Sequence, residues 1–202
     1  NQITVLPTLP ANLQSLDCID NLLTQLPALP QSLTALECGI NQINSLPSLP
    51  AGLQILNCNS NNISNLPALP NSLLHLNCSS NAINNLPQLP ASLKNLNCGY
   101  NLLTSVPVLP AGLQSFVCDV NHLAYLPELP TSLTKLICDY NNLTYLPELP
   151  DSLFELDCRA NAGLHCLPQL KRIVNLYFDS LVIGCLPNYG NVTNSSPAMA
   201  NV

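Results

Sequence analysis

The sequence predicts a right-handed solenoid of stacked 20-residue coils, with a parallel β-sheet on its concave face, extended polyproline-II-like backbone on its convex face and little helix. Pairs of prolines three residues apart recur every 20 positions, from Pro7 and Pro10 to Pro147 and Pro150. Two further series keep this period without a slip, and we call them the ladder cysteines and the ladder asparagines. They are Cys18, Cys38, Cys58, Cys78, Cys98, Cys118, Cys138 and Cys158, and Asn21, Asn41, Asn61, Asn81, Asn101, Asn121, Asn141 and Asn161. Repeats of this length indicate coils that pack on their neighbours around one continuous core.

The first half of each unit predicts a short strand. The unit follows the pattern L-x-x-L-x-C-x-x-N-x-L-x-x-L-P-x-L-P-x-x. In the segment Ala35-Leu36-Glu37-Cys38, alternation places Leu36 and Cys38 on the core side and Ala35 and Glu37 on the outer side. Stacked units would then form a parallel sheet whose strands lie about 4.8 Å apart.

The second half of each unit predicts a turn followed by extended backbone. The ladder asparagine follows the strand, and its amide can both donate and accept, so it can satisfy the backbone of its own coil and of the next one. Two prolines three residues apart exclude a helix and favour extended backbone. Because extended segments need roughly the spacing of strands, we expect the solenoid to curve gently.

The repeat pattern predicts one solenoid of about nine coils over residues 1–187, followed by a polar tail or linker over residues 188–202. The N-terminal coil is expected to be truncated, because the first seven residues match only the second half of a unit. Near the C-terminus Phe178 stands at the cysteine position and Leu181 at the asparagine position, so the asparagine series ends there. The tail has no periodicity and is expected to lack a core of its own.

The repeats resemble those of the short, 20-residue class of bacterial leucine-rich repeat proteins. The segment LPELPTSLTKLICDYNNL, from Leu126 to Leu143, is similar to the repeats of YopM- and IpaH-type secreted effectors. Cysteine at the position where those effectors carry valine or isoleucine is more similar to secreted and surface leucine-rich repeat proteins of Bacteroidetes. The resemblance implies the solenoid fold strongly and a ligand only weakly, since such repeats carry many ligands.

Composition argues against several classes of function. The chain has a net charge of −6 and only five lysines and arginines, which disfavours binding to nucleic acid or to an anionic membrane. No apolar run approaches the roughly 18 residues that a membrane span needs.

The histidines His75, His122 and His165 share neither a column nor a catalytic motif. We therefore expect no enzyme, no cofactor and no metal site, and we interpret the columns Glu128/Glu148 and Asp119/Asp139 as a solvated acidic face rather than a calcium site.

The cysteines fall into two groups. The eight ladder cysteines are expected to be reduced thiols inside the core, where a thiol behaves as a small apolar group, with pairing between some of them as the alternative. Cys166 and Cys185 instead precede Leu-Pro on adjacent coils, and they are a candidate disulfide that would fix the last coil. Two partly buried thiols are the alternative. A bridge would imply an oxidising compartment.

The outward residues of the strands are the expected site for a protein ligand on the concave face. Exposed tyrosines are favoured at binding sites, and few aromatic residues are present in this chain. The candidate partner-binding residues are Tyr100, Val117, Val120, Lys135, Ile137, Tyr140 and Tyr177. The alternative is that tyrosine and β-branched residues simply suit strands.

The sequence therefore predicts a non-enzymatic interaction module of a secreted or cell-surface bacterial protein, with host interaction or adhesion as its setting. An effector scaffold that acts in the host cytosol is one alternative. A glycan-binding surface, with tyrosines for stacking and the Asn- and Gln-rich face for hydrogen bonding, is another. A spacer with no ligand on the sheet is the third.

Overall fold

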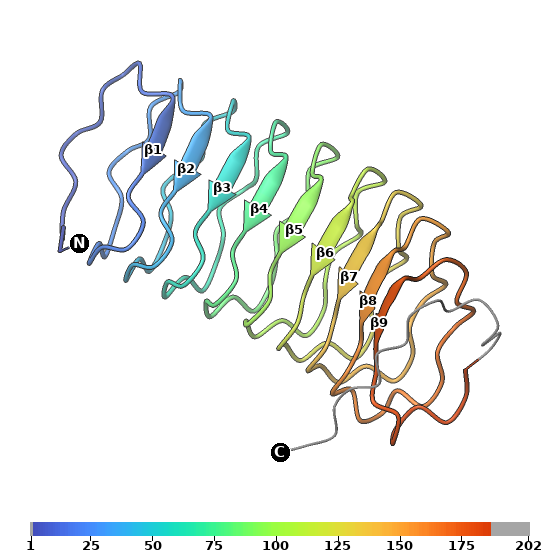
Figure 1. Ribbon diagram of the computed structural model, residues 1–202. Helices are drawn as coiled ribbons and strands as arrows, with labels where there is room; N and C mark the ends of the chain where they lie inside the picture. Colours follow the sequence, from blue (N-terminus) through green and yellow to red (C-terminus); the bar gives the residue numbers. More distant parts are fainter. Residues whose placement is uncertain (1, 187–202) are drawn as a thin grey trace.

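The computed structural model describes residues 2–186, which form a solenoid with nine three-residue strands and no helix among these residues. Each strand pairs in parallel with the next one along the chain, so the sheet follows the order β1 to β9 (Figure 1). The predicted tail over residues 188–202 lies outside the described residues. The strands are β1 (Ser15–Asp17), β2 (Ala35–Glu37), β3 (Ile55–Asn57), β4 (His75–Asn77), β5 (Asn95–Asn97), β6 (Ser115–Val117), β7 (Lys135–Ile137), β8 (Glu155–Asp157) and β9 (Asn175–Tyr177).

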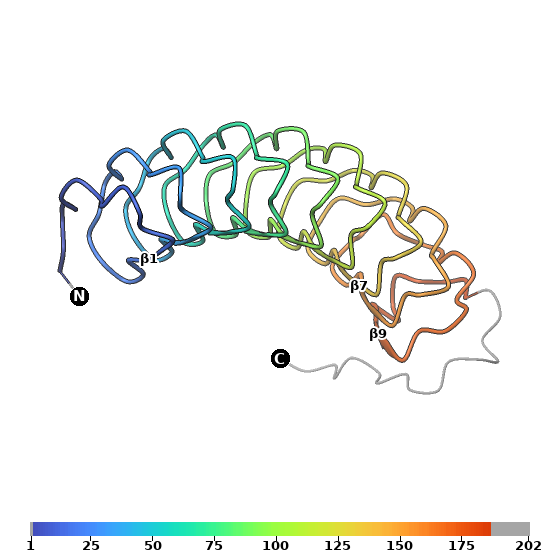
Figure 2. The ribbon, with the colours of Figure 1, turned by 90° about the horizontal axis from the view of Figure 1, so that it is seen from above.

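The sheet lines the concave face of the solenoid, as predicted. Figure 2 shows the stack bent into a clear arc, with the labelled strands on its inner side and the remainder of each coil extending to its outer side. The register advances by one repeat per strand, so that Leu36 pairs with Leu56 and Leu56 with Leu76. Each repeat position therefore forms a straight column that crosses the sheet.

The core runs without interruption along the solenoid. Leu36, Cys38 and Ile43 are fully buried, and the equivalent residues of the following coils are buried in the same way. Phe116 takes the leucine position in β6 and is fully buried, while Phe178 packs against the core only in part. Because a single coil cannot enclose its own leucines, the stability of each coil depends on its neighbours.

The ladder asparagines connect each coil to the coil before it. The Nδ2 group of Asn101 donates to the carbonyl oxygens of Cys98 and Gly99 in its own coil, at 3.1 and 3.0 Å, and to that of Cys78 in the preceding coil, at 3.1 Å. Its Oδ1 accepts from the backbone N–H of Ile83 at 3.0 Å. The bonds thus reach back to the preceding coil rather than forward to the next one, contrary to our expectation, because those backbone groups lie directly under the amide.

The turn before each ladder asparagine has a left-handed backbone that the sequence did not indicate. Within residues 2–186, eight non-glycine residues have φ between 49° and 58°. Two of them, Ile40 and Val120, are β-branched, which makes this conformation costly. Hydrogen bonds between coils hold it in place, such as that from the N–H of Tyr100 to the carbonyl of Asp119, at 2.8 Å. The eight residues are Asp20, Ile40, Ser60, Ser80, Tyr100, Val120, Tyr140 and Ala160.

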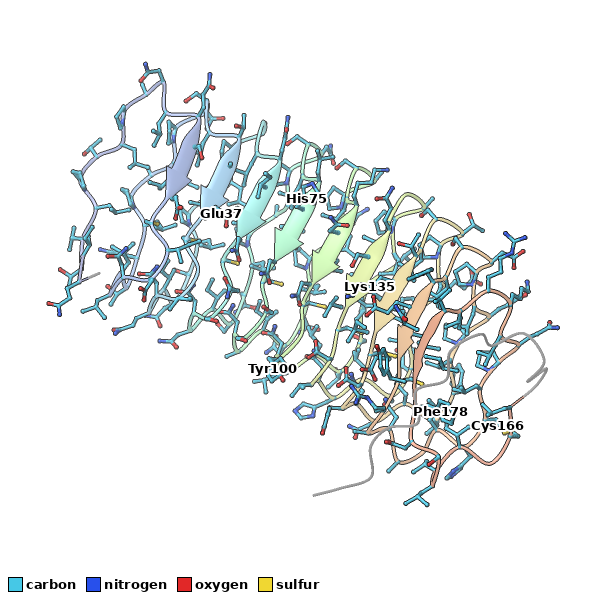
Figure 3. The ribbon with its side chains drawn as sticks, in the orientation of Figure 1. Glu37, His75, Tyr100, Lys135, Cys166 and Phe178 are labelled. Carbon is cyan, nitrogen blue, oxygen red and sulfur yellow. A yellow bond between two sulfur atoms is a disulfide. The ribbon has the colours of Figure 1, made fainter. Side chains whose placement is uncertain are left out.

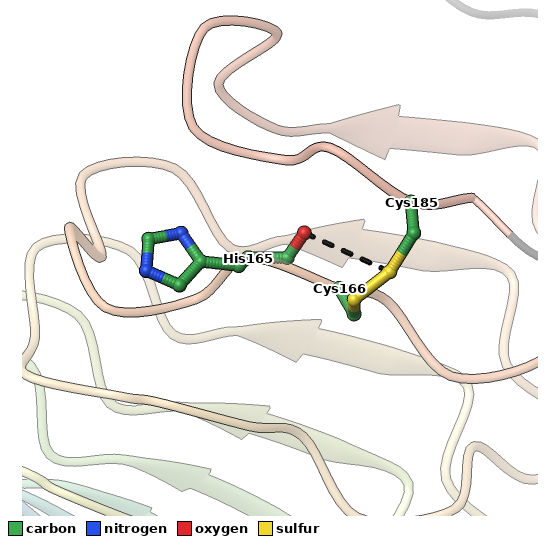
Figure 4. Close-up of a disulfide and its surroundings, with 3 residues drawn as sticks. All are labelled: His165, Cys166 and Cys185. Atoms are coloured by element: carbon green, nitrogen blue, oxygen red, sulfur yellow. Dashed lines mark hydrogen bonds between the residues drawn. A yellow bond between two sulfur atoms is a disulfide. The ribbon is translucent and has the colours of Figure 1, made fainter.

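The last coil is attached differently from the others. Leu181 stands where an asparagine would continue the ladder and is fully exposed. A disulfide instead joins Cys166 to Cys185, whose Cα atoms lie 4.8 Å apart (Figure 4). Beside it the N–H of Gly184 donates to the carbonyl of His165 at 2.9 Å. The disulfide therefore fixes the last coil at the place where the asparagine ladder is missing.

Candidate interaction surface

The middle of the concave face is polar and uncharged. Asn57, His75, Asn77, Asn95 and Asn97 line part of a shallow hollow of about 530 Å³ that extends across β2 to β7. The Nδ2 atom of Asn95 lies 2.8 Å from the Nδ1 atom of His75. Glu37 and Lys135 line the two ends of the hollow, while the amides between them offer hydrogen bonds to a polar ligand.

Toward the C-terminus the face becomes apolar and aromatic. Val117 in β6 lies directly beside Ile137 in β7. Just past the strand ends, Tyr100, Val120 and Tyr140 occupy the same left-handed turn position in successive coils. Figure 3 shows Tyr100 beyond the strands, whereas the labelled Glu37 and Lys135 lie along them. We call these five residues, Tyr100, Val117, Val120, Ile137 and Tyr140, the strand-end patch.

The two tyrosines of the strand-end patch face solvent. Tyr100 is 56% exposed and Tyr140 is 62% exposed. Their backbones are held by hydrogen bonds to the following coil, that of Tyr140 by a 3.0 Å bond to the carbonyl of Arg159. The patch is therefore an aromatic surface on a fixed backbone, which would lose little conformational entropy when a partner binds.

Two other predicted partner-binding residues, Lys135 and Tyr177, already have partners within the chain. The Nζ atom of Lys135 lies 3.3 Å from Oε2 of Glu155 on the neighbouring strand. The guanidinium of Arg159 lies over the ring of Tyr177, 5.3 Å from its centroid. Tyr177 is also two strands away from Ile137, with Asp157 between them. The structure therefore pairs Val117 with Ile137 and places Tyr100, Val120 and Tyr140 in one column past the strand ends, whereas Lys135 and Tyr177 contact other residues of the chain.

Arg159 is fixed by two hydrogen bonds from its side chain to Asp157. Its Nε donates to Oδ1 at 3.0 Å and one of its NH2 groups donates to Oδ2 at 2.6 Å. The hydrogen bond to Asp157 raises the pKa of Arg159. Paired and planar contacts of this kind hold a guanidinium in one orientation. Arg159 thus neutralises Asp157 and covers Tyr177 rather than presenting a free charge.

Asp119 and Asp139 lie beside the strand-end patch on consecutive coils. Burial and, to a smaller extent, the negative charges of Asp157 and Asp119 raise the pKa of Asp139 to about 6, although a backbone hydrogen bond and the charge of Arg159 oppose this rise. Burial also raises the pKa of Asp119. The carboxylate of Asp119 lies over Gly99, where a side chain would collide with it. Both carboxylates are thus partly buried on consecutive coils, and the charge of Asp119 acts on Asp139.

The comparisons with known proteins identify the family. No family model and no curated protein matches the chain. A solved leucine-rich repeat domain of a Shigella effector is 32% identical, with a TM-score of 0.64 over 84% of this chain and 72% of that domain. The chain belongs to the bacterial leucine-rich repeat family. The predicted likeness to Bacteroidetes members stays a prediction.

Two further leucine-rich repeat structures align with this chain. YopM from Yersinia enterocolitica WA-314 is 29% identical, with a TM-score of 0.52 over 91% of the chain, which spans 57% of that protein. The leucine-rich repeat chain of FLRT2 is 26% identical, with a TM-score of 0.68 over 88% of this chain and 64% of that one. That chain was solved in an octameric complex with Latrophilin 3 and Unc5D. These likenesses support an interaction scaffold.

The ladder thiols of this leucine-rich repeat chain are chemically inert at neutral pH. All eight are buried and unpaired. Burial raises the pKa of Cys18 to about 11 and that of Cys158 to about 12, and raises those of the six thiols between them as well. Since the thiolate is the nucleophile and the metal ligand, these cysteines act as core residues.

Within residues 2–186, no group of three or more His, Cys, Asp or Glu residues is placed to hold a metal ion. The same residues include no helix with the length and apolar character of a membrane span.

Sequence reasoning missed a second ladder, which is made of serines. Ser132, for example, donates from Oγ to the carbonyl oxygens of Ala111 and Leu113 in the preceding coil, at 2.8 and 2.6 Å. The sequence indicates this serine ladder by the recurrence of serine directly before the first leucine of a unit. Equivalent bonds to the preceding coil are made by Ser32, Ser72, Ser92 and Ser152. The contacts of Arg159 were also missed, because spacing alone does not say which side chain a guanidinium will meet.

The carboxylate of Asp139 is expected to lower stability at neutral pH. Its folded pKa of about 6 exceeds its ordinary value of 3.8, so the folded chain holds this proton more tightly than the unfolded chain. The penalty is absent below about pH 3.8 and complete above about pH 6. Because the group is partly exposed, Asp139→Asn should raise the free energy of unfolding at pH 7 by only about 1 kcal/mol.

Urea denaturation at pH 4 and pH 7 measures this effect. The gain should be present at pH 7 and nearly absent at pH 4. Glu148→Gln changes a carboxylate that is largely exposed, and it should alter stability by less than about 0.5 kcal/mol at either pH. An Asp139→Asn variant that is less stable than the parent at pH 7 would contradict the expected sign.

Proposed function

We propose that the chain is a non-enzymatic module that binds a protein partner on its concave face, with the strand-end patch as the centre of the contact. The observation that carries this proposal is the pair of exposed tyrosines, Tyr100 and Tyr140, beside the Val117–Ile137 pair on a fixed backbone. Aromatic and branched apolar groups around a rigid centre supply most of the binding energy in many interfaces. The FLRT2 complex, in which a similar chain meets protein partners, supports the same role.

A double variant, Ile137→Ala with Tyr140→Ala, tests this proposal. Binding to a panel of purified host cell-surface and extracellular-matrix proteins should weaken by about 30-fold, because hot-spot side chains contribute about 2 kcal/mol or more. Biolayer interferometry provides the affinities. The matched control is Tyr125→Ala with Tyr145→Ala, which removes two tyrosines of similar exposure from positions past the asparagine turn. A double variant that binds every member of the panel as well as the parent would refute the proposal.

We further propose that the protein works at the cell surface or after secretion, in host interaction or adhesion. Both half-cystines of the Cys166–Cys185 disulfide are exposed, and such bonds persist in oxidising compartments. The likeness to a Shigella effector domain supports the alternative, a scaffold that acts in the host cytosol. Mass spectrometry of the protein at its site of action separates the two. A bridged pair favours the surface, and two free thiols favour the cytosol.

The polar hollow favours a second candidate function, the binding of a neutral glycan. Asn77 and Asn97 present amides at successive positions of one column, and His75 lies beside them. The Oδ1 atoms of Asn77 and Asn97 accept from the backbone N–H of Ser79 and Gly99, and their Nδ2 groups can donate to the hydroxyl groups of a sugar. A glycan array should then give hits that Asn77→Ala with Asn97→Ala abolishes. An array without hits would remove this candidate.

A further inference from the structure

The charges around the strand-end patch are unevenly neutralised. Lys135 and Arg159, two of the cations at this end of the sheet, are each paired, with Glu155 and Asp157 respectively. Among residues 2–186, neither Asp119 nor Asp139 has an ion-pair partner. The patch therefore combines an apolar, aromatic surface with two carboxylates that form no ion pair within residues 2–186.

The chain order places each of these carboxylates one residue before a turn residue of the patch and two residues after a strand residue of it. Asp119 stands between Val117 and Val120, and Asp139 between Ile137 and Tyr140. The turn backbones repeat in register, since the N–H of Val120 donates to the carbonyl of Asp139 at 3.0 Å. The surface thus presents, in each of two successive coils, an apolar strand residue, a partly buried carboxylate and a turn residue, of which Val120 is half-buried and Tyr140 is exposed.

We propose that the partner of this surface is a cationic protein segment, in which lysine or arginine side chains accompany apolar ones, and that Asp119 and Asp139 receive the basic groups. This inference rests on the proposed function, because it names the chemistry of the partner for the same patch. The long stems of lysine and arginine bury well against apolar surface while their charged ends reach a carboxylate. Opposite charge also selects the partner, since an anionic surface would be repelled by this acidic chain.

The electrostatics of the free protein agree with this assignment. The negative charges of Asp157, from the coil after, and Asp119, from the coil before, both act on Asp139, and a backbone hydrogen bond and Arg159 only partly offset them. The free protein therefore carries unfavourable negative charge at this place. A bound lysine or arginine would relieve that repulsion.

Selection from a displayed library of random peptides of about 12 residues tests the inference. The parent protein is expected to enrich peptides that combine lysine or arginine with apolar residues. Synthetic copies of the enriched peptides should bind Asp119→Asn/Asp139→Asn about tenfold more weakly or worse, as measured by fluorescence anisotropy. The matched control, Glu128→Gln/Glu148→Gln, removes the same number of charges away from the patch and should bind like the parent.

The outcomes separate this inference from the proposed function. If the enriched peptides are neutral or acidic, or if the Asn and Gln variants weaken binding equally, the cationic partner is wrong. The proposed function survives either result when binding still depends on Ile137 and Tyr140. A selection that yields no peptide dependent on Ile137 and Tyr140 contradicts both. Circular dichroism of each variant confirms that it is folded before binding is compared.

Discussion

Replacing Asn61 by alanine will lower the free energy of unfolding by about 3–5 kcal/mol. The Nδ2 group of Asn61 donates to the carbonyl oxygens of Cys38, Cys58 and Asn59, each at 3.1 Å, and its Oδ1 accepts from the N–H of Ile43 at 2.9 Å. The side chain is buried, so alanine would leave backbone groups of two coils without partners and without access to water. The loss should be large because one side chain satisfies both coils.

The neighbouring Asn62 provides a matched control for Asn61. Its side chain is exposed, so Asn62→Ala should change stability by less than about 0.5 kcal/mol. Urea denaturation followed by circular dichroism measures both variants. In Asn61→Ala, backbone amides should exchange their hydrogens faster in the coils on either side of position 61 than elsewhere, because each coil depends on its neighbours. Equal stability of the two variants would show that the ladder does not connect the coils.

Replacing Phe116 by alanine will lower the free energy of unfolding by about 3–5 kcal/mol. Phe116 is fully buried in β6, where it lies between Leu96 of β5 and Leu136 of β7. Alanine would leave a cavity that the flanking leucines cannot fill without moving their strands. Phe116→Leu, which restores the usual residue of this column, should lose much less.

A second phenylalanine, Phe154, allows the effect of burial to be isolated. It is 50% exposed, and Phe154→Ala should alter stability far less than Phe116→Ala. Thermal unfolding of the two variants and the parent provides the comparison. If both variants lose the same stability, the continuous core would not be what holds the coils together.

Much of the fold followed from the repeat itself. An exact period of 20 residues places Leu36 over Leu56 and predicts the parallel register, and alternation around Leu36 and Cys38 predicts which side chains are buried. The same register brought Val117 beside Ile137, so the centre of the strand-end patch was predictable. These features depend only on spacing and on polarity, which the sequence states directly.

The remaining features depend on local geometry that spacing does not determine. The left-handed turn at Ile40 and Val120 runs against the preference of β-branched residues, and only the bonds between coils explain it. The 20-residue spacing places Lys135 next to Glu155 on the neighbouring strand. It does not predict how the long, flexible side chain of Lys135 is oriented, and so it does not predict the ion pair. The contact of the Arg159 guanidinium with the ring of Tyr177 likewise depends on a side-chain orientation that the spacing does not predict.

The alkylation of cysteines, counted by intact mass, tests the central claim that stacked coils enclose one continuous core of leucine and cysteine. With iodoacetamide the native chain should gain no adduct, because the eight ladder thiols are buried and Cys166 is bridged to Cys185. Unfolding in urea without reductant should give eight adducts, and unfolding with reductant should give ten. Rapid labelling of Cys58 or Cys98 in the native chain would contradict the account.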